Sequence, residues 1–133
     1  MLPALIHRVY KSKINNQPLS VWGTGKPLRE FIYSSDIANL ALWALENYND
    51  ETPLIMTSGI ETSIKDAVEI IAEHFNFENE IIYNKSKPDG QFRKPSDTSK
   101  LDEHLPNYDW ISVRSGIKKT VGWFEANYPK IRI

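Results

Sequence analysis

The chain has 133 residues, a length that suits one domain with a modest hydrophobic core. Its 16 basic and 17 acidic side chains leave a net charge of −1, so no long-range field attracts nucleic acid or an anionic membrane. The absence of cysteine excludes disulfides, thiolate catalysis and zinc–cysteine sites. Without a long apolar run or a signal-peptide pattern, we expect a soluble cytoplasmic protein with no membrane or nucleic-acid partner.

The first half of the sequence has the patterns of two helices and two short strands. We expect helices over residues 2–10 and 37–48 and strands over residues 19–22 and 30–33. The first helix has apolar side chains at helical spacing and Pro3 in its first turn. A Gly/Pro-rich turn separates the two strands.

The second predicted helix has a wide apolar surface. The polar residues before it can cap its first turn, and they are Ser34, Ser35 and Asp36. The stripe that we expect in the core comprises Ile37, Leu40, Ala41, Ala44 and Leu45. Leu42 and Trp43 widen this stripe, which predicts burial on two sides of the helix.

The second half predicts strands over residues 54–56 and 80–83 and two more helices. One helix begins after a capping box of Ser63 and Asp66, and the other begins after Ser112. Between them, residues 85–100 form a long polar loop with five cationic side chains, and a loop of this length needs a functional reason. The elements together predict an α/β fold: one small mixed domain, residues 1–133, of about four helices with short strands.

A candidate ligand site lies in residues 21–36, around the turn between the first two strands. Trp22 offers a flat aromatic face for a base or sugar ring, and Arg29 offers a planar guanidinium for phosphate. Glycines at positions 23 and 25 let the backbone come close to a ligand. This combination indicates half of a sugar-nucleotide site. Trp22 could instead be an ordinary core aromatic, which is the usual fate of a tryptophan on a strand.

Two further arginines, Arg8 and Arg93, could also hold a diphosphate. Plainer roles stay open for these cations. Arg29 could pair with Glu30 or Asp36, and Arg8 could lie on a solvated helix face.

Three stretches of the sequence resemble those of one enzyme family. Residues 22–36 resemble the W-G-[ST]-G-x-P-x-R-[ED]-F-[IL]-x-x-x-D segment of the GDP-L-fucose synthases, which are extended short-chain dehydrogenase/reductases. Residues 86–94, Ser-Lys-Pro-Asp-Gly-Gln-Phe-Arg-Lys, resemble the family's second substrate-domain signature, and residues 2–8 are a third match. The matches keep the family's order, cover nearly the whole chain and correspond to the C-terminal part of the full enzyme.

The resemblance implies a substrate-binding domain that lacks the Rossmann half of the enzyme. The full enzyme would convert GDP-4-keto-6-deoxy-D-mannose to GDP-L-fucose by 3,5-epimerisation and NADPH-dependent 4-reduction. The implied substrate contacts are Arg8, Trp22, Arg29, Asp89 and Lys94. Without the resemblance, Asp89 could only cap a turn and Lys94 could be a solvated lysine.

The resemblance also implies what this part of the enzyme does not supply. NADP(H) would bind to the missing N-terminal domain, where the catalytic residues also lie, so we expect no catalytic, cofactor-binding or metal-binding residue and no activity of the isolated chain. The full enzyme would be a homodimer, and the isolated domain should self-associate through the surface that meets the cofactor domain. Two alternatives are the substrate domain of another NDP-sugar epimerase or dehydratase, and a non-catalytic fragment that binds a nucleotide or a partner.

Two patterns imitate parts of a dinucleotide enzyme. Gly23-Thr24-Gly25 resembles the start of a Rossmann fingerprint, but Leu28 replaces the third glycine and a strand should follow. Tyr83 and Lys87 have the Tyr-x-x-x-Lys spacing of a reductase proton donor, but we expect the tyrosine to end a strand rather than lie on a helix. The histidines, His7, His74 and His104, lack metal-ligand spacing.

Overall fold

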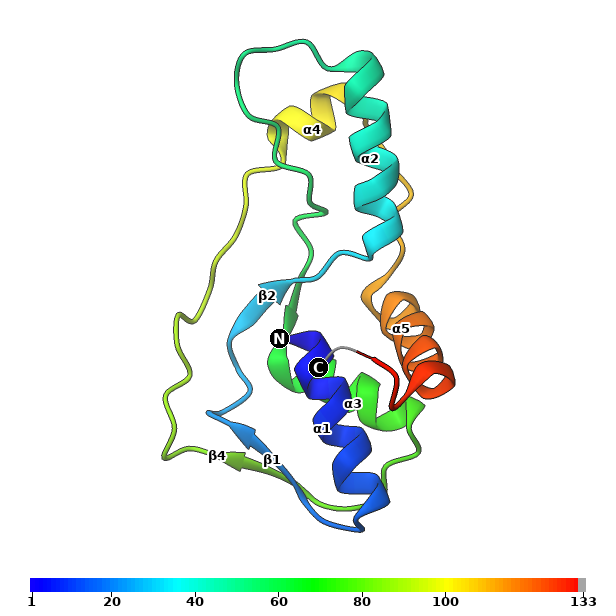
Figure 1. Ribbon diagram of the computed structural model, residues 1–133. Coiled ribbons are helices and arrows are strands. Elements are labelled where there is room, and N and C mark those ends of the chain that lie inside the picture. The colour runs from blue at the N-terminus through cyan, green and yellow to red at the C-terminus, as the bar shows by residue number, and fades with distance from the viewer. Residues whose placement is uncertain (132–133) are drawn as a thin grey trace.

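The computed structural model describes residues 1–131, which form five helices and four short strands (Figure 1). In chain order these are α1 (Leu2–Ile14), β1 (Leu19–Trp22), β2 (Leu28–Glu30), α2 (Ser34–Asn47), β3 (Glu61–Ser63), α3 (Ile64–His74), β4 (Ile81–Asn84), α4 (Ser99–His104) and α5 (Val113–Asn127). The predicted α/β class is confirmed, with one helix more than expected. No helix of this described part is long and apolar enough to cross a membrane.

Helices α1, α3 and α5 pack with the parallel β1–β4 pair into what we call the body, the lower part of Figure 1. The strands are in register from Leu19 opposite Ile81 to Trp22 opposite Asn84. The buried core of the body comprises Leu5, Ile6, Val9, Leu19, Val21, Val68, Ile71, Phe75, Ile117, Val121 and Phe124. Each such large side chain contributes about 1.5–3 kcal/mol when it leaves water, so the body accounts for most of the stability of the fold.

The local signals in the body work as predicted. The Ser63 hydroxyl accepts a hydrogen bond from the Asp66 amide at 2.9 Å, and the Ser112 hydroxyl accepts one from the Ser115 amide at 3.2 Å. Both caps satisfy amides that have no partner inside the helix. The regular apolar period of α3 lies against the core, because its side chains at helical spacing share one face.

A second pair of strands, β2 and β3, corrects the sequence analysis. The strand expected over 30–33 lies at Leu28–Glu30, and residues 54–56 form no strand. The antiparallel partner of β2 is instead β3, which pairs from Leu28 opposite Ser63 to Glu30 opposite Glu61. Each strand has three residues and β3 is wholly polar, so neither has an apolar alternation that could reveal it.

Helix α2, residues 48–60 and α4 form what we call the arm, which extends away from the body at the top of Figure 1. Helix α4 begins within the stretch, residues 85–100, where only a loop was expected. Its six residues are too few to show a helical period.

The start of α2 also differs from the prediction. The helix begins at Ser34, and its N-cap residue Tyr33 makes no side-chain cap. Asp36 does not cap the helix either: it is buried, and its Oδ2 accepts a hydrogen bond from the Ile111 amide at 3.0 Å. This carboxylate therefore fixes the chain that leads into α5.

The expected core stripe of α2 is wrong. Leu40 is buried, but Ile37 and Leu42 are exposed and Leu45 is 83% exposed. Burial on two sides of the helix, which Leu42 and Trp43 led us to expect, is also absent at Leu42. Burial of this exposed face depends on a neighbour, and no element within residues 1–131 covers it.

Candidate functional site

Two segments of chain run side by side at one edge of the body (Figure 1). The first is residues 22–30, and the second is residues 85–98, which we call the β4–α4 loop. Because β1 and β4 are parallel, the chain that leaves each strand continues in the same direction. Contacts tie the two segments together in order: Lys87 with Trp22, Asp89 with Thr24, Phe92 with Leu28, and Ser96 with Glu30.

Trp22 is the last residue of β1, where alternation places Leu19 and Val21 in the core and Trp22 outside. Its side chain is 66% exposed, so it is not a core aromatic. The Lys87 ammonium lies 5.7 Å from the ring centroid, within the range of a cation–π contact. An indole face and a cation therefore lie side by side at the surface. Such a pair can bind a ligand in which a flat ring is attached to an anionic group.

Arg8 connects α1 to the strand that carries Trp22. Its Nη2 donates a hydrogen bond to the Ser20 carbonyl, and the side chain is half-buried. The side chain therefore contacts β1 and is at the same time partly accessible to water from its helix face. The contact holds the guanidinium two residues before Trp22.

Arg29 connects β2 to the β4–α4 loop. Its Nη2 donates to the Gln91 carbonyl at 2.8 Å, and its Nη1 donates to the Leu28 carbonyl at 2.5 Å. Arg29 pairs with neither Glu30 nor Asp36, so the simple ion-pair alternative is wrong. Its guanidinium has five N–H donors, and these two bonds fix its plane, while the other donors bond no acceptor within residues 1–131.

Asp89 closes the turn that follows β1. Its Oδ1 accepts from the Thr24 amide at 2.5 Å and its Oδ2 accepts from the Thr24 hydroxyl at 2.8 Å, and these bonds lower the pKa of the carboxyl. Gly23 has a φ of +79°, and a Cβ on it would lie 2.1 Å from Oδ1 of Asp89. A glycine is therefore required there by both backbone conformation and space. Each carboxylate oxygen keeps a further lone pair for a ligand.

Lys94 lies on the same loop, and its side chain is exposed. The residue before it, Arg93, donates from Nε to Oε2 of Glu61 at 2.5 Å. Four residues of the implied substrate site, Trp22, Arg29, Asp89 and Lys94, thus lie on the two adjacent segments, and Arg8 bonds Ser20 in β1, just before the first of them. The sequence offers no reason to include Glu30 and Glu61 in the site, although both accept hydrogen bonds from the loop, because the one signal near them is the Arg-Glu dipeptide of β2.

The two sequence patterns that resemble parts of a dinucleotide enzyme do not form a Rossmann phosphate loop or a helical Tyr-x-x-x-Lys pair. The Gly23–Gly25 turn leads into β2 rather than a helix, so it does not fit the pyrophosphate of NADP(H). Tyr83 lies in β4 with its hydroxyl buried, and burial followed by the charges of Glu69 and Asp66 raises its pKa. Lys87 instead reaches Trp22.

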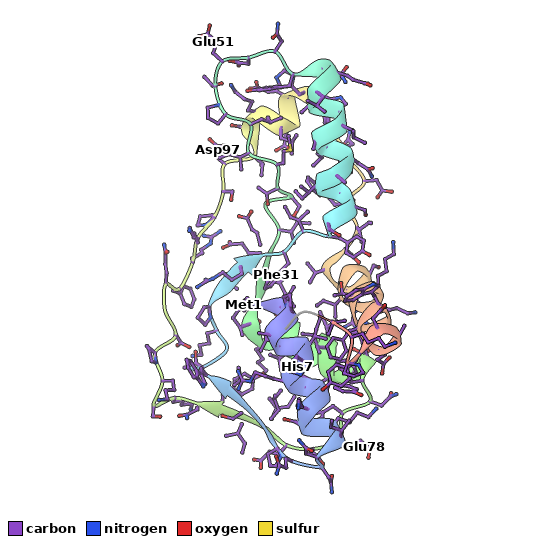
Figure 2. All side chains as sticks on the ribbon, viewed as in Figure 1. Met1, His7, Phe31, Glu51, Glu78 and Asp97 are labelled. Atoms are coloured by element: carbon purple, nitrogen blue, oxygen red, sulfur yellow. The ribbon has the colours of Figure 1, made fainter. Side chains whose placement is uncertain are left out.

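Two of the three histidines, His7 and His104, lie against aromatic rings. His7 lies on α1, as Figure 2 shows. Its ring centroid lies 6.1 Å from that of Phe124 and 5.9 Å from that of Tyr128. His104 contacts the rings of Trp43 and Tyr48 in the arm. Within residues 1–131, no group of three or more His, Asp or Glu side chains could hold a metal ion.

Comparison with known proteins defines the class first. Residues 1–59 match the NAD dependent epimerase/dehydratase family. The fold is that of the C-terminal part of an extended short-chain reductase, because it superposes on a GDP-mannoheptose C4 reductase from Campylobacter jejuni with a TM-score of 0.78 at 28% identity, over 93% of this chain and 44% of that one.

Closer similarities are to one group within this class. The chain is 40% identical to a GDP-L-fucose synthase of Dictyostelium discoideum, over 99% of this chain and 42% of the relative. A crystal structure of a GDP-L-fucose synthetase from Naegleria fowleri superposes with a TM-score of 0.96 at 37% identity, over 99% of this chain and 41% of that one, and a second structure of it has NADP bound. The chain is therefore homologous to GDP-L-fucose synthases over nearly its whole length, as the sequence motifs implied, and it spans about two fifths of their length.

Proposed function

We propose that the chain is the GDP-sugar-binding part of an enzyme that makes GDP-L-fucose from GDP-4-keto-6-deoxy-D-mannose by 3,5-epimerisation and NADPH-dependent 4-reduction. The homology to GDP-L-fucose synthases supports this function. The observation that carries it is the exposed indole of Trp22, with Arg8 and Arg29 held in place on either side of it in the chain.

Each residue of the proposed site has a distinct role in binding. Trp22 stacks on a flat ring of the nucleotide sugar, while Arg8 and Arg29 bind the diphosphate through guanidinium N–H groups. Asp89 accepts hydrogen bonds from hydroxyl or base N–H groups, and Lys94 adds a cation. Binding of the non-reacting nucleotide positions the sugar for chemistry elsewhere in the enzyme.

The cofactor and the catalytic groups are proposed to lie outside this chain. The turn at Gly23–Gly25 does not fit a dinucleotide, so NADP(H) would bind to a preceding domain and the isolated chain would be inactive. We further propose that the complete enzyme is a cytoplasmic homodimer and that the isolated chain self-associates.

Calorimetric titration of the chain with GDP, GDP-fucose, UDP-galactose and NADPH tests the proposal. We expect guanosine-selective binding, no NADPH binding, and a loss of at least tenfold in affinity for Trp22→Ala and Arg29→Ala. Trp123→Ala and Arg114→Ala are matched controls, because Trp123 is similarly exposed on α5 and Arg114 forms a surface ion pair with Glu73. UDP-galactose binding as tight as that of GDP-fucose would contradict the proposal.

A second candidate is the equivalent part of another GDP-sugar reductase, which the similarity to the GDP-mannoheptose C4 reductase favours. Both candidates predict GDP binding. An activity assay of the complete enzyme distinguishes the two candidates, because only a GDP-L-fucose synthase converts GDP-4-keto-6-deoxy-D-mannose to GDP-L-fucose.

A further inference from the structure

The β2–β3 pair places two carboxylates, Glu30 and Glu61, directly opposite each other. Opposed side chains of an antiparallel pair lie close together, and like charges there destabilise the sheet. The Glu61 side chain is only 10% exposed, so water screens the repulsion poorly. A pair of three-residue strands can hold these carboxylates only if each of them has a favourable partner.

Both carboxylates find a partner on the β4–α4 loop. Oε2 of Glu61 accepts from Nε of Arg93 at 2.5 Å, and Oε1 of Glu30 accepts from the Ser96 amide at 2.8 Å. The other Glu30 oxygen accepts from the Thr57 hydroxyl at 2.5 Å. Burial, the largest single effect on Glu30, raises its pKa, but the hydrogen bonds from Thr57 and Ser96 outweigh it and the pKa is lowered. The glutamate is therefore held as an anion.

The contact with Glu61 leaves most of the Arg93 guanidinium unused. Arg93 bonds through Nε, while no acceptor within residues 1–131 bonds its Nη1 or Nη2. Its side chain is 59% exposed, so an anion can reach these groups. Lys94 follows directly, between the two points at which the carboxylates hold the loop.

We propose that Glu30 and Glu61 are positioning residues, which hold residues 93–96 in the conformation that presents Arg93 and Lys94 to the phosphates of a nucleotide sugar. Glu61 acts through Arg93, and Glu30 acts through the Ser96 amide. The inference rests on the proposed function for the identity of the anion. The holding of the loop follows from the contacts alone, so the two parts can fail separately.

Amide hydrogen exchange tests the holding of the loop without any nucleotide. Glu30→Gln leaves one acceptor oxygen for two donors, and Glu61→Gln removes the charge that Arg93 faces. We expect exchange in peptides covering residues 89–98 to become at least fivefold faster in both variants, with α3 unchanged. Glu73→Gln is the control. It removes a carboxylate that accepts a hydrogen bond from Arg114 at 2.5 Å, the same distance as between Arg93 and Glu61, but this pair lies outside the loop. Unchanged exchange in the loop would overturn the positioning role.

A double-mutant cycle, with GDP-fucose as the probe, tests whether Glu61 acts on nucleotide binding through Arg93. We expect Glu61→Gln to weaken GDP-fucose binding about tenfold in the natural chain and less than twofold in Arg93→Ala, because Glu61 acts only through Arg93. Equal weakening in both backgrounds would overturn this route. If the natural chain binds no GDP-fucose, the proposed function and the presentation of Arg93 fail together, while the exchange measurement still decides whether the carboxylates hold the loop.

Discussion

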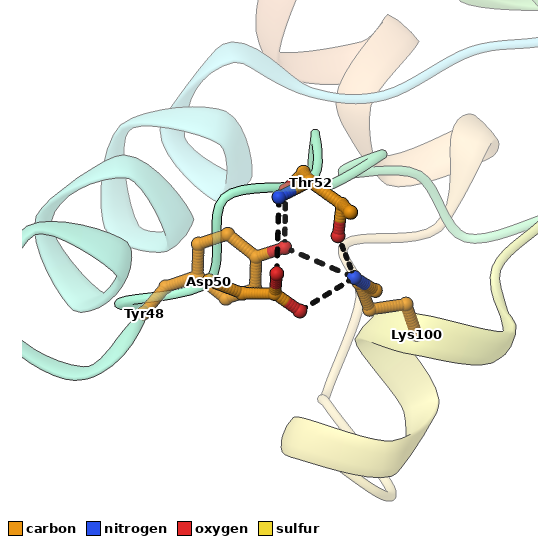
Figure 3. A network of polar contacts seen from close by, with 4 residues as sticks. All are labelled: Tyr48, Asp50, Thr52 and Lys100. Atoms are coloured by element: carbon orange, nitrogen blue, oxygen red, sulfur yellow. Dashed lines mark hydrogen bonds and ion pairs between the residues drawn. The ribbon is translucent and has the colours of Figure 1, made fainter.

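The body and the arm of this molecule differ in how many apolar side chains they bury. The body buries a continuous set of apolar side chains between three helices and a strand pair. In the arm, Leu40 and Leu101 are buried, and at the tip the Lys100 ammonium bonds Asp50, Thr52 and the Tyr48 hydroxyl, as Figure 3 shows. The Lys100 and Asp50 side chains are 33% and 45% exposed, and ion pairs that water reaches contribute little to stability.

This difference indicates which part of the chain can support a site. The candidate site lies on β1, β2 and the β4–α4 loop, all of which are anchored to the body. The arm leaves apolar side chains of α2 in water, a pattern typical of a surface that meets another protein surface. The body therefore buries its apolar side chains within itself, whereas one face of α2 in the arm would be buried only by a neighbour.

The largest change in the free energy of unfolding should follow a substitution in the core of the body. Phe75 is fully buried among Tyr10, Phe124 and the other core residues, so Phe75→Ala should lower the free energy of unfolding by about 3–5 kcal/mol. Urea unfolding monitored by circular dichroism measures this loss. Phe92→Ala, which truncates an exposed phenylalanine, should change it by less than about 0.5 kcal/mol. Similar losses in both variants would contradict the assignment of the core.

A substitution where α2 joins the body should lower the free energy of unfolding by a smaller amount. Asp36→Ala removes the acceptor of the Ile111 amide and should cost about 1–3 kcal/mol in the same unfolding measurement. Asp36→Asn keeps an acceptor oxygen and should lose less. If the two variants are equally destabilised, the hydrogen bond to Ile111 is not the cause.

The polar network of the arm should be visible in its pH dependence. The hydrogen bond from Lys100, followed by that from the Thr52 amide, lowers the pKa of Asp50 to about 2. Because the folded pKa lies below the unfolded one, the network stabilises the arm above the ordinary aspartate pKa and loses this contribution as the pH falls toward 2. Carbon NMR titration of the carboxyl should give this low pKa, and Lys100→Met should return it toward the usual aspartate range. An unchanged value in Lys100→Met would show that Lys100 is not the cause.

The smallest effect on stability should come from the exposed face of α2. Leu45→Lys should leave the free energy of unfolding within about 0.5 kcal/mol, because Leu45 is already in water. It should instead reduce the proposed self-association, measured by sedimentation at several concentrations. Ile14→Lys, at an exposed position at the end of α1, is the control and should leave association unchanged. A natural chain that stays monomeric at every concentration would contradict the role of this face.

The sequence alone determined the elements whose signals are local. Helices α3 and α5 follow from an apolar period and from the caps at Ser63 and Ser112, since helical hydrogen bonds join residues close in sequence. The motifs around Trp22 and Asp89 likewise identified the relatives.

Only the tertiary structure decided the features that depend on distant residues. The pairing of β2 with β3, the bond from Ile111 to Asp36 and the opposed carboxylates of Glu30 and Glu61 join residues that lie far apart in the chain. The apolar pattern of α2 was plain, but its exposure was not. A pattern states which side chains avoid water, and only the arrangement of the whole fold decides whether another element covers them.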